Sequence, residues 1–255
     1  MIRVASLGSG SKGNATLIQA NATTLLIDCG FGLKDVEQRL AVKGVSPGDL
    51  SAIFVTHEHG DHLKGAPMLA NKYSIPLWAS AGTARFFKRD VPTHQVLNPH
   101  EKYTIGDISV EPVTVPHDAT EPTQFVFHAS GVRVGLLTDL GSITEHVKEV
   151  YKHCNLLMLE CNHDPQMLLD GPYPYSLKKR VGGDYGHLSN QQAVELLNSV
   201  DKDMLSQVLI SHISEQNNDE QLAINAVEAA LVNQNVSVLM LTQADGCDWL
   251  DVTKE

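Results

Sequence analysis

Residues 56–62 read Thr56-His57-Glu58-His59-Gly60-Asp61-His62 and close an apolar, strand-like run that begins at Ala52. Imidazole nitrogens and carboxylate oxygens are good ligands for divalent zinc or manganese. A turn at the end of a strand can aim three imidazoles and a carboxylate into one cleft, which a regular helix or strand could not do at this spacing. The stretch therefore predicts a divalent-metal site at a strand end rather than a solvated histidine-rich loop.

Three more potential ligands stand in the same context further along the chain. His117 follows Val113–Pro116, Asp139 follows Gly135–Thr138, and His212 follows Val208–Ser211, so each comes after an apolar strand-like run. One such residue alone is more often an ordinary hydrogen-bonded side chain. Together with the first motif and in this order, they predict a complete ligand set drawn from several strand ends.

The rest of the chain alternates strand-like and helix-like patterns. Strands are predicted at Ile2–Leu7, Ala15–Gln19, Thr23–Ile27, Ala52–Thr56, Pro76–Ala79, Val96–Leu97, Ile108–Val115, Gln124–His128, Arg133–Thr138, Leu156–Glu160, Gln207–Ser211 and Ser237–Leu241. Helices are predicted at Leu33–Val42, His62–Tyr73, Ala81–Lys88, Thr144–Lys152, Ser189–Val200 and Asp219–Asn233. Two strand-rich stretches, each followed by helices, favour an α/β (α+β) fold, with two packed sheets and outer helices in one domain over residues 1–255.

The charge balance limits the partners. Nineteen basic against thirty acidic residues give a net charge of −11, which excludes a strongly basic nucleic-acid binder as a description of the whole chain. A local basic patch remains open, because residues 201–255 alone hold ten acidic and two basic side chains. The oligomeric state is left open.

The apolar and cysteine patterns predict a cytoplasmic protein without a membrane segment. No uninterrupted apolar run approaches the roughly 18 residues of a membrane span, and Gly8–Lys12 stands where a secretory signal would be apolar. Four cysteines, none in a C-x-x-C pair, are expected to be reduced and mostly buried: Cys29, Cys154, Cys161 and Cys247.

The order of these motifs resembles the metallo-β-lactamase superfamily, whose fold is an αββα sandwich of two mixed β-sheets flanked by helices. The resemblance implies two divalent ions per chain, zinc or manganese. It assigns His57, His59 and His117 to one ion, Asp61, His62 and His212 to the other, and Asp139 to a bridge between them. Asp28, in Asp28-Cys29-Gly30, would support the loop beneath. Asp61-His62 and the lack of a cysteine ligand argue against a true β-lactamase and for the hydrolase branches.

Further segments look like the YycJ/WalJ group of this superfamily: Gly8–Thr16, Leu159–Asp164, Tyr173-Pro174, Leu177-Lys178, Gly186–Asn190, Ser211–Ser214 and Asn217-Asn218. That group implies DNA phosphodiester hydrolysis with 5′→3′ exonuclease action, and hence a DNA partner. Gly186–Ser189 also resembles the His-Ser/Thr motif of tRNase Z and of the cyclic phosphodiesterase PhnP. No insertion large enough for a β-CASP domain separates Asp139 from His212.

His187 is the residue that distinguishes a phosphodiester hydrolase from a lactonase or thioesterase. Phosphodiester cleavage expels a poor alkoxide leaving group, so a proton donor helps, and we expect His187 to act as that acid unless it is merely hydrogen-bonded in its turn. Asp61 is expected to serve the catalytic site as well as the metal. Asn162 and His163 would contact phosphate or pack beneath the site, and Cys161 is expected to be buried rather than reactive.

The densest basic run is Lys178-Lys179-Arg180, expected in a turn. It would grip a phosphate backbone or be an ordinary solvated turn. The alternatives to a DNA nuclease are a small cyclic phosphodiesterase, a glyoxalase-II-like thioesterase or lactonase, and a non-enzymatic metal-binding module.

Overall fold

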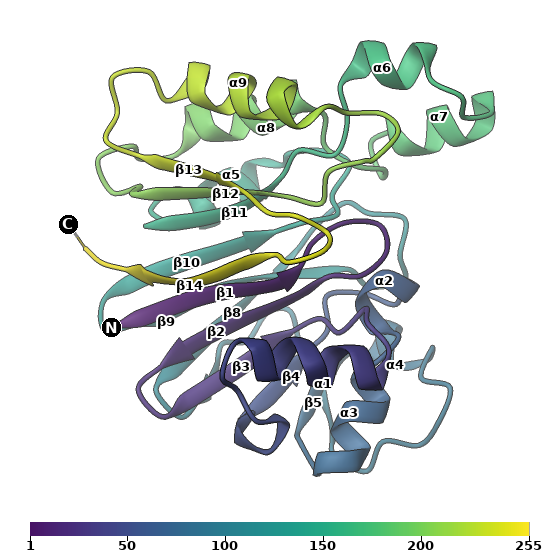
Figure 1. Ribbon diagram of the computed structural model, residues 1–255, viewed down its shortest axis with the longest axis vertical. Helices are drawn as coiled ribbons and strands as arrows, with labels where there is room; N and C mark the ends of the chain where they lie inside the picture. The colour runs from purple at the N-terminus through teal and green to yellow at the C-terminus, as the bar shows by residue number, and fades with distance from the viewer. Residues whose placement is uncertain (255) are drawn as a thin grey trace.

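A computed structural model of the chain describes residues 1–254. Two seven-stranded sheets pack face to face, with helices on both outer faces (Figure 1). The expected αββα sandwich is confirmed. Among these residues no helix is long and apolar enough to cross a membrane.

Both sheets are mixed. The first runs in the order β14 (Cys247–Val252), β1 (Ile2–Gly8), β2 (Ala15–Ala20), β3 (Thr23–Ile27), β4 (Ala52–Phe54), β5 (Leu77–Ser80) and β6 (His94–Leu97). The second runs β13 (Ser237–Met240), β12 (Gln207–Ser211), β11 (Leu156–Glu160), β10 (Val132–Leu137), β9 (Thr123–Ala129), β8 (Ile108–Thr114) and β7 (Tyr103–Ile105). Strands β3 to β6 are parallel, as are β10 to β13, so their carboxyl ends meet at common edges.

Three apolar clusters correspond to the three interfaces of the sandwich. Phe54, Phe125 and Phe127 belong to the cluster between the sheets. A second cluster joins the second sheet to its helices, and a third joins the first sheet to its helices. The helices beside the first sheet are α1 (Leu33–Val42), α2 (Gly60–Leu63), α3 (Ala66–Tyr73) and α4 (Ala81–Ala84), with a short 3-10 turn at Pro47–Asp49. Those beside the second are α5 (Glu145–Tyr151), α6 (Pro165–Asp170), α7 (Tyr175–Val181), α8 (Asn190–Ser199) and α9 (Glu220–Ala230).

Two predicted helices are shorter than expected. The predicted helix His62–Tyr73 is divided into α2 and α3 at Gly65, where an added Cβ would lie 2.2 Å from the Phe31 carbonyl oxygen. The predicted helix Ala81–Lys88 ends at Ala84, and residues 85–87 continue in a tighter turn whose amides bond three residues back. The chain therefore leaves the helix just before Lys88, in a loop beside α2.

Three further elements differ from the sequence expectations. Strands β7 and β14 were not expected, and β14 pairs with β1. The basic run Lys178-Lys179-Arg180 lies on helix α7 and not in a turn. Pro174 precedes the first residue of that helix, a place where proline is tolerated, so the Pro and Gly residues flank the helix rather than abolish it.

The four cysteines are free and buried, as expected. Burial raises the pKa of the Cys154 thiol to about 12 and raises that of Cys161 further still. Both therefore stay in the unreactive thiol form at neutral pH, which fits packing roles.

Candidate metal centre

Three imidazoles from two loops face one another at the edge of the sandwich. His57 and His59 follow β4, and His117 follows β8. Their candidate ligand atoms all lie within 4.8 Å of one another. His117 Nε2 is 3.3 Å from His59 Nδ1, and the His57 ring packs edge-on against both other rings. These three nitrogens could hold one cation.

A second group lies directly beside the first. Asp61 Oδ2 is 3.3 Å from both His62 Nε2 and His212 Nε2. Asp139 lies between the two groups, because it shares a further possible ligand set with His57 and His62. The structure thus brings together all seven side chains in the grouping expected from the sequence. Their roles as ligands remain a prediction.

The outward nitrogen of four of these imidazoles is held by an acceptor. His57 Nδ1 lies 2.9 Å from Thr56 Oγ1, and His62 Nδ1 lies 2.7 Å from Asp28 Oδ2. His117 Nδ1 lies 2.9 Å from the Gly186 carbonyl oxygen, and His212 Nδ1 lies 3.1 Å from Glu160 Oε1. Such partners fix the tautomer and leave the inward Nε2 lone pair for a metal. Thr56 Oγ1 in turn donates to Asp28, so Asp28 braces both imidazoles.

Two inward atoms lack the partner that burial demands. His57 Nε2 and Asp139 Oδ2 are buried and have no hydrogen bond among residues 1–254. Asp139 Oδ2 is 3.1 Å from His62 Nε2, and the two atoms meet as lone pairs when Asp28 holds the His62 proton. An unsatisfied buried polar atom costs free energy. A cation at this point would satisfy both, so the residues fit a divalent metal centre.

The ionisation states of the site residues also favour a bound cation. Burial lowers the pKa of His57 well below its usual value, so this imidazole is neutral and can donate a lone pair. Burial would raise the pKa of Asp139, but the neighbouring His212 and His62 outweigh it and lower the pKa well below the usual range. Burial would also raise the pKa of Asp61, but His62 and His212 outweigh it and lower this pKa below its usual value. Asp61 and Asp139 are thus anionic and His57 is neutral, which are the forms in which these side chains bind a cation.

Three residues of the centre have strained backbones. Asp28, Asp139 and His212 have φ of 60°, 56° and 51°, and each immediately follows or lies within two residues of a strand end. This left-handed region is uncommon for residues other than glycine and costs about 1 kcal/mol or more. This conformation turns each side chain back toward the common edge of the sheets. The packing of the sheets therefore has to offset the backbone strain that positions the cluster.

A buried carboxylate that the sequence analysis missed supports the site. Glu160 ends β11 and is fully buried. Its Oε1 lies 2.8 Å from His187 Nδ1 and 3.1 Å from His212 Nδ1, while Oε2 accepts from the amides of Leu140 and Leu188. Burial would raise its pKa, but the charge and hydrogen bond of His187 and that of His212 lower it to about 2. Its place at a strand end was the available signal.

His187 lies at the mouth of this cluster. Its side chain is 18% exposed, and its ring centroid is 5.3 Å from those of both His117 and His212. Burial lowers its pKa, but Glu160 outweighs this and raises the pKa above the usual histidine value. Gly186 permits this placement, because a Cβ there would lie 2.2 Å from the carbonyl oxygens of Arg180 and Val181.

A family model described as a beta-lactamase superfamily domain matches residues 23–213, from β3 to just beyond His212. The chain belongs to this superfamily. The match spans the whole metal-ligand set that the geometry assembles.

Two relatives within the superfamily match almost the whole chain. "Exodeoxyribonuclease YycJ" of Bacillus anthracis is 35% identical over 237 residues, which cover 91% of this chain and 90% of the relative. "Exodeoxyribonuclease WalJ" of Streptococcus pneumoniae is 32% identical over 246 residues, covering 94% of this chain and 88% of the relative. The resemblance to the YycJ/WalJ group is therefore confirmed.

Solved superfamily structures share the fold at low identity. The metallo-beta-lactamase fold protein YhfI from Bacillus subtilis aligns with a TM-score of 0.75 at 17% identity, covering 98% of this chain and all of that one. Zn(2+)-bound PqqB from Methylobacterium extorquens aligns with a TM-score of 0.71 at 16% identity and the same coverage. These likenesses concern the fold alone.

The three basic residues expected to contact the substrate lie on helix α7, near the candidate metal centre. On α7, Arg180 forms an ion pair with Asp118, whose Oδ1 is 3.5 Å from His117 Nε2. Lys178 donates to the Leu169 carbonyl oxygen, and Lys179 is exposed. Helix α7 therefore borders the centre, and neither Lys178 nor Lys179 has an acidic partner among the described residues.

Asn162 and His163 lie beneath the surface. Both are buried, and Asn162 donates through Nδ2 to the His212 carbonyl oxygen at 3.0 Å. Burial lowers the pKa of His163 to about 4, so it is neutral at neutral pH. Of the two roles expected from the sequence, this burial favours packing and positioning of His212 over contact with a phosphate.

Proposed function

We propose that this chain is a dinuclear, divalent-metal-dependent phosphodiester hydrolase that degrades DNA as a 5′→3′ exonuclease. The names of the YycJ and WalJ relatives support the DNA substrate, over nine-tenths of the chain. The observation that carries the reaction class is the His187–Glu160 pair at the mouth of the seven-residue cluster. We also propose zinc or manganese as the metal, a single domain, and a cytoplasmic location that suits four free, buried cysteines.

In this proposal His57, His59 and His117 would hold one cation, and Asp61, His62 and His212 would hold a second. Asp139, which lies between the two groups, would serve both. When bound, the metals supply an acidified water as nucleophile and neutralise charge on the phosphate oxygens. No carboxylate is needed as a separate base.

The protein supplies the proton that the leaving group needs. Because His187 Nδ1 faces Glu160, its Nε2 is free to donate a proton to the departing sugar oxygen. The raised pKa favours the protonated form of the ring, which is the form that donates this proton. Glu160 thus keeps His187 oriented and charged, which a thioester or lactone hydrolase would need much less.

Five substrates test the proposal: 5′-labelled duplex DNA, bis-p-nitrophenyl phosphate, a small cyclic phosphodiester, a thioester and a lactone. Protein loaded with zinc or manganese should hydrolyse the first two and release nucleotides from the 5′ end, and metal analysis should find close to two ions per chain. Turnover of the thioester or lactone without the phosphodiesters would overturn it. Turnover of a small cyclic phosphodiester but not of DNA would instead favour the PhnP-like alternative.

A further inference from the structure

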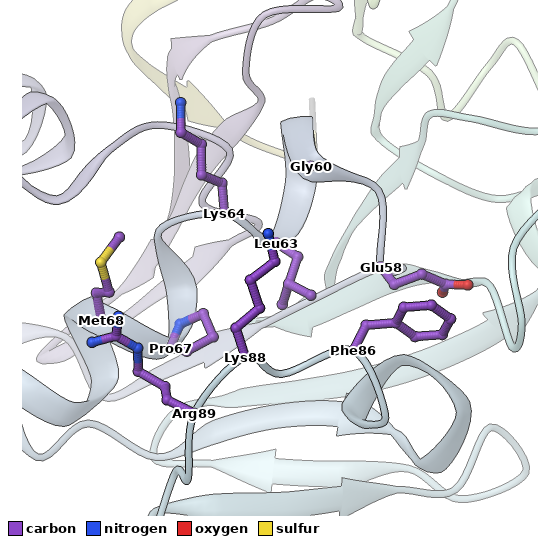
Figure 2. Close-up of a pocket in the computed structure, with 9 residues that line it drawn as sticks. All are labelled: Glu58, Gly60, Leu63, Lys64, Pro67, Met68, Phe86, Lys88 and Arg89. Carbon is purple, nitrogen blue, oxygen red and sulfur yellow. The ribbon is translucent and has the colours of Figure 1, made fainter.

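A cavity of about 500 Å³ opens beside helix α2 (Figure 2). One wall comes from the metal motif itself, through Glu58, Gly60 and Leu63, and the facing wall comes from residues 86–89 after α4. Since Glu58 lies between His57 and His59 in sequence, the groove begins next to the candidate metal centre. Its volume lies within the roughly 300–1,000 Å³ typical of ligand sites.

The groove gathers cations without acidic partners. Lys64, Lys88 and Arg89 line it and are exposed, and none forms an ion pair with an acidic side chain anywhere in residues 1–254. Elsewhere, lysines such as Lys43 and Lys72 pair with carboxylates at 2.7–2.8 Å. In a chain of net charge −11, three unpaired cations in one groove favour a polyanion.

An aromatic ring is presented to the same space. Phe86 is 49% exposed, whereas its neighbour Phe87 packs into the apolar cluster of the first sheet. Figure 2 shows the Phe86 ring and the Glu58 side chain toward one end of the groove, with Arg89 and Met68 toward the other and Lys88 between them. An exposed aromatic among cations is the combination on which single-stranded nucleic acids stack.

Glu58 adds a hydrogen-bond acceptor. Its Oε1 accepts from the Thr120 amide and hydroxyl, both at 2.7 Å, which fixes the carboxylate. Its Oε2 is buried and has no hydrogen-bond partner in the described part of the chain. An N–H group at the edge of a nucleobase would satisfy this oxygen, as every DNA base carries one.

We propose that this groove binds an unpaired segment of the DNA strand next to the scissile phosphate, with one base stacked on Phe86. Glu58 Oε2 accepts from the base, and Lys64, Lys88 and Arg89 contact flanking phosphates. This inference rests on the proposed nuclease function, since it extends the path of the same strand away from the metal centre. The sequence signal is Arg85-Phe86-Phe87-Lys88-Arg89, in which basic residues flank two aromatic residues.

The probe is a single-stranded phosphorothioate oligothymidylate with a 3′ fluorophore, compared with an abasic oligomer of equal length and charge. Fluorescence anisotropy should show tighter binding of the oligothymidylate by the wild-type protein. Phe86→Leu should weaken that binding roughly 5- to 100-fold, the scale of one lost stacking contact, and remove the preference over the abasic oligomer. Phe86→Tyr keeps an aromatic ring, so it should retain both the affinity for the oligothymidylate and the preference over the abasic oligomer.

The charges are tested separately. Lys64→Gln/Lys88→Gln/Arg89→Gln should weaken both oligomers and flatten the slope of log affinity against log salt by about 2, at about 0.7 per phosphate on a single strand. Lys34→Gln/Lys152→Gln/Lys254→Gln is the matched charge control, because these three exposed residues lie outside the groove, and Leu222→Ala on α9 is the apolar control. Turnover of bis-p-nitrophenyl phosphate, too small to reach the groove, should be unchanged in every variant.

The outcomes separate this inference from the proposed function. DNA hydrolysis with oligonucleotide affinity insensitive to Phe86→Leu and to the triple variant would overturn the groove and leave the nuclease standing. Oligonucleotide binding that depends on Phe86 without any DNA hydrolysis would support the groove and overturn the nuclease. Equal affinity of the wild-type protein for both oligomers, or no binding of either, would overturn the stacking proposal.

Discussion

The interior of the sandwich and its metal-bearing edge are built from the same strands by opposite means. Between the sheets, Phe54, Phe125 and Phe127 pack against aliphatic side chains with no buried charge among them. At the edge, the residues that follow β3, β4, β8, β10 and β12 include buried histidines and carboxylates, with left-handed backbones at Asp28, Asp139 and His212. The interior is held by apolar contacts, whereas two buried polar atoms at the edge, His57 Nε2 and Asp139 Oδ2, have no hydrogen-bond partner among the described residues. Substitutions in the two regions should therefore separate stability from activity.

The largest effect on turnover is expected from Asp139→Asn. An amide is a poor ligand for two cations, so metal content and activity should fall together, activity by more than about 10²-fold. Asn tolerates φ of 56° as well as Asp does, so the melting temperature of the metal-free protein should hold. Metal analysis, activity and thermal unfolding measure the three quantities. If the variant kept wild-type metal content and turnover, Asp139 would not be a metal ligand.

His187→Ala comes next. Both metals should stay bound, but hydrolysis of DNA should slow by roughly 10²–10⁴, the usual contribution of a general acid. Bis-p-nitrophenyl phosphate should lose much less, because p-nitrophenolate leaves without a proton. His146→Ala, an exposed histidine away from the cluster, is the control. Equal losses on both substrates would indicate a structural role instead.

Glu160→Gln should have an intermediate effect. The variant keeps the size of the side chain, but its single carbonyl oxygen cannot accept both from the Leu140 and Leu188 amides and from the two imidazoles, as the two carboxylate oxygens do. Partners that orient metal ligands typically contribute 10- to 100-fold, and we expect that loss in metal affinity or turnover. Glu111→Gln removes a carboxylate bound to His128 instead and should leave both unchanged. An unaffected Glu160→Gln would contradict the orienting role.

Lys179→Gln on α7 should change substrate affinity only. Lys178 and Arg180 already have partners within the protein, so Lys179 is the cleanest probe of phosphate contact by this helix. KM for DNA should rise several-fold, with the salt slope reduced by about 0.9 for duplex DNA and turnover of bis-p-nitrophenyl phosphate retained. Parallel slopes would make this basic run an ordinary solvated helix face.

Phe127→Ala should leave the specific activity of the folded protein unchanged. Phe127 is fully buried between the sheets, and removing its ring should cost about 3–5 kcal/mol of unfolding free energy. Denaturant unfolding and activity at low temperature measure the two effects. A loss of metal affinity in this variant would show that the interior and the edge are coupled, and would contradict the expected separation of stability from activity.

The same contrast explains what the sequence could predict. Apolar strands and the polar residues that end them are local patterns, so the seven ligand candidates and two packed sheets with outer helices could be inferred from them, and the superfamily resemblance implied the αββα sandwich. Strand β14 could not be inferred, because its place depends on pairing with β1, over two hundred residues away. Glu160 was missed because its role depends on His187 and His212 meeting in three dimensions. Helix α7 was missed because its flanking prolines and glycines suggested a turn.

The pairing of β1 with β14 also governs the order in which the protein can be completed during synthesis. Ile2 lies opposite Val252, so β1 is synthesised long before the strand that covers its edge. Until then one edge of β1 has no partner, and open edges invite pairing with other chains. The candidate metal centre needs only residues up to His212. A nascent chain can therefore have all seven candidate ligands available while its first sheet is still unfinished.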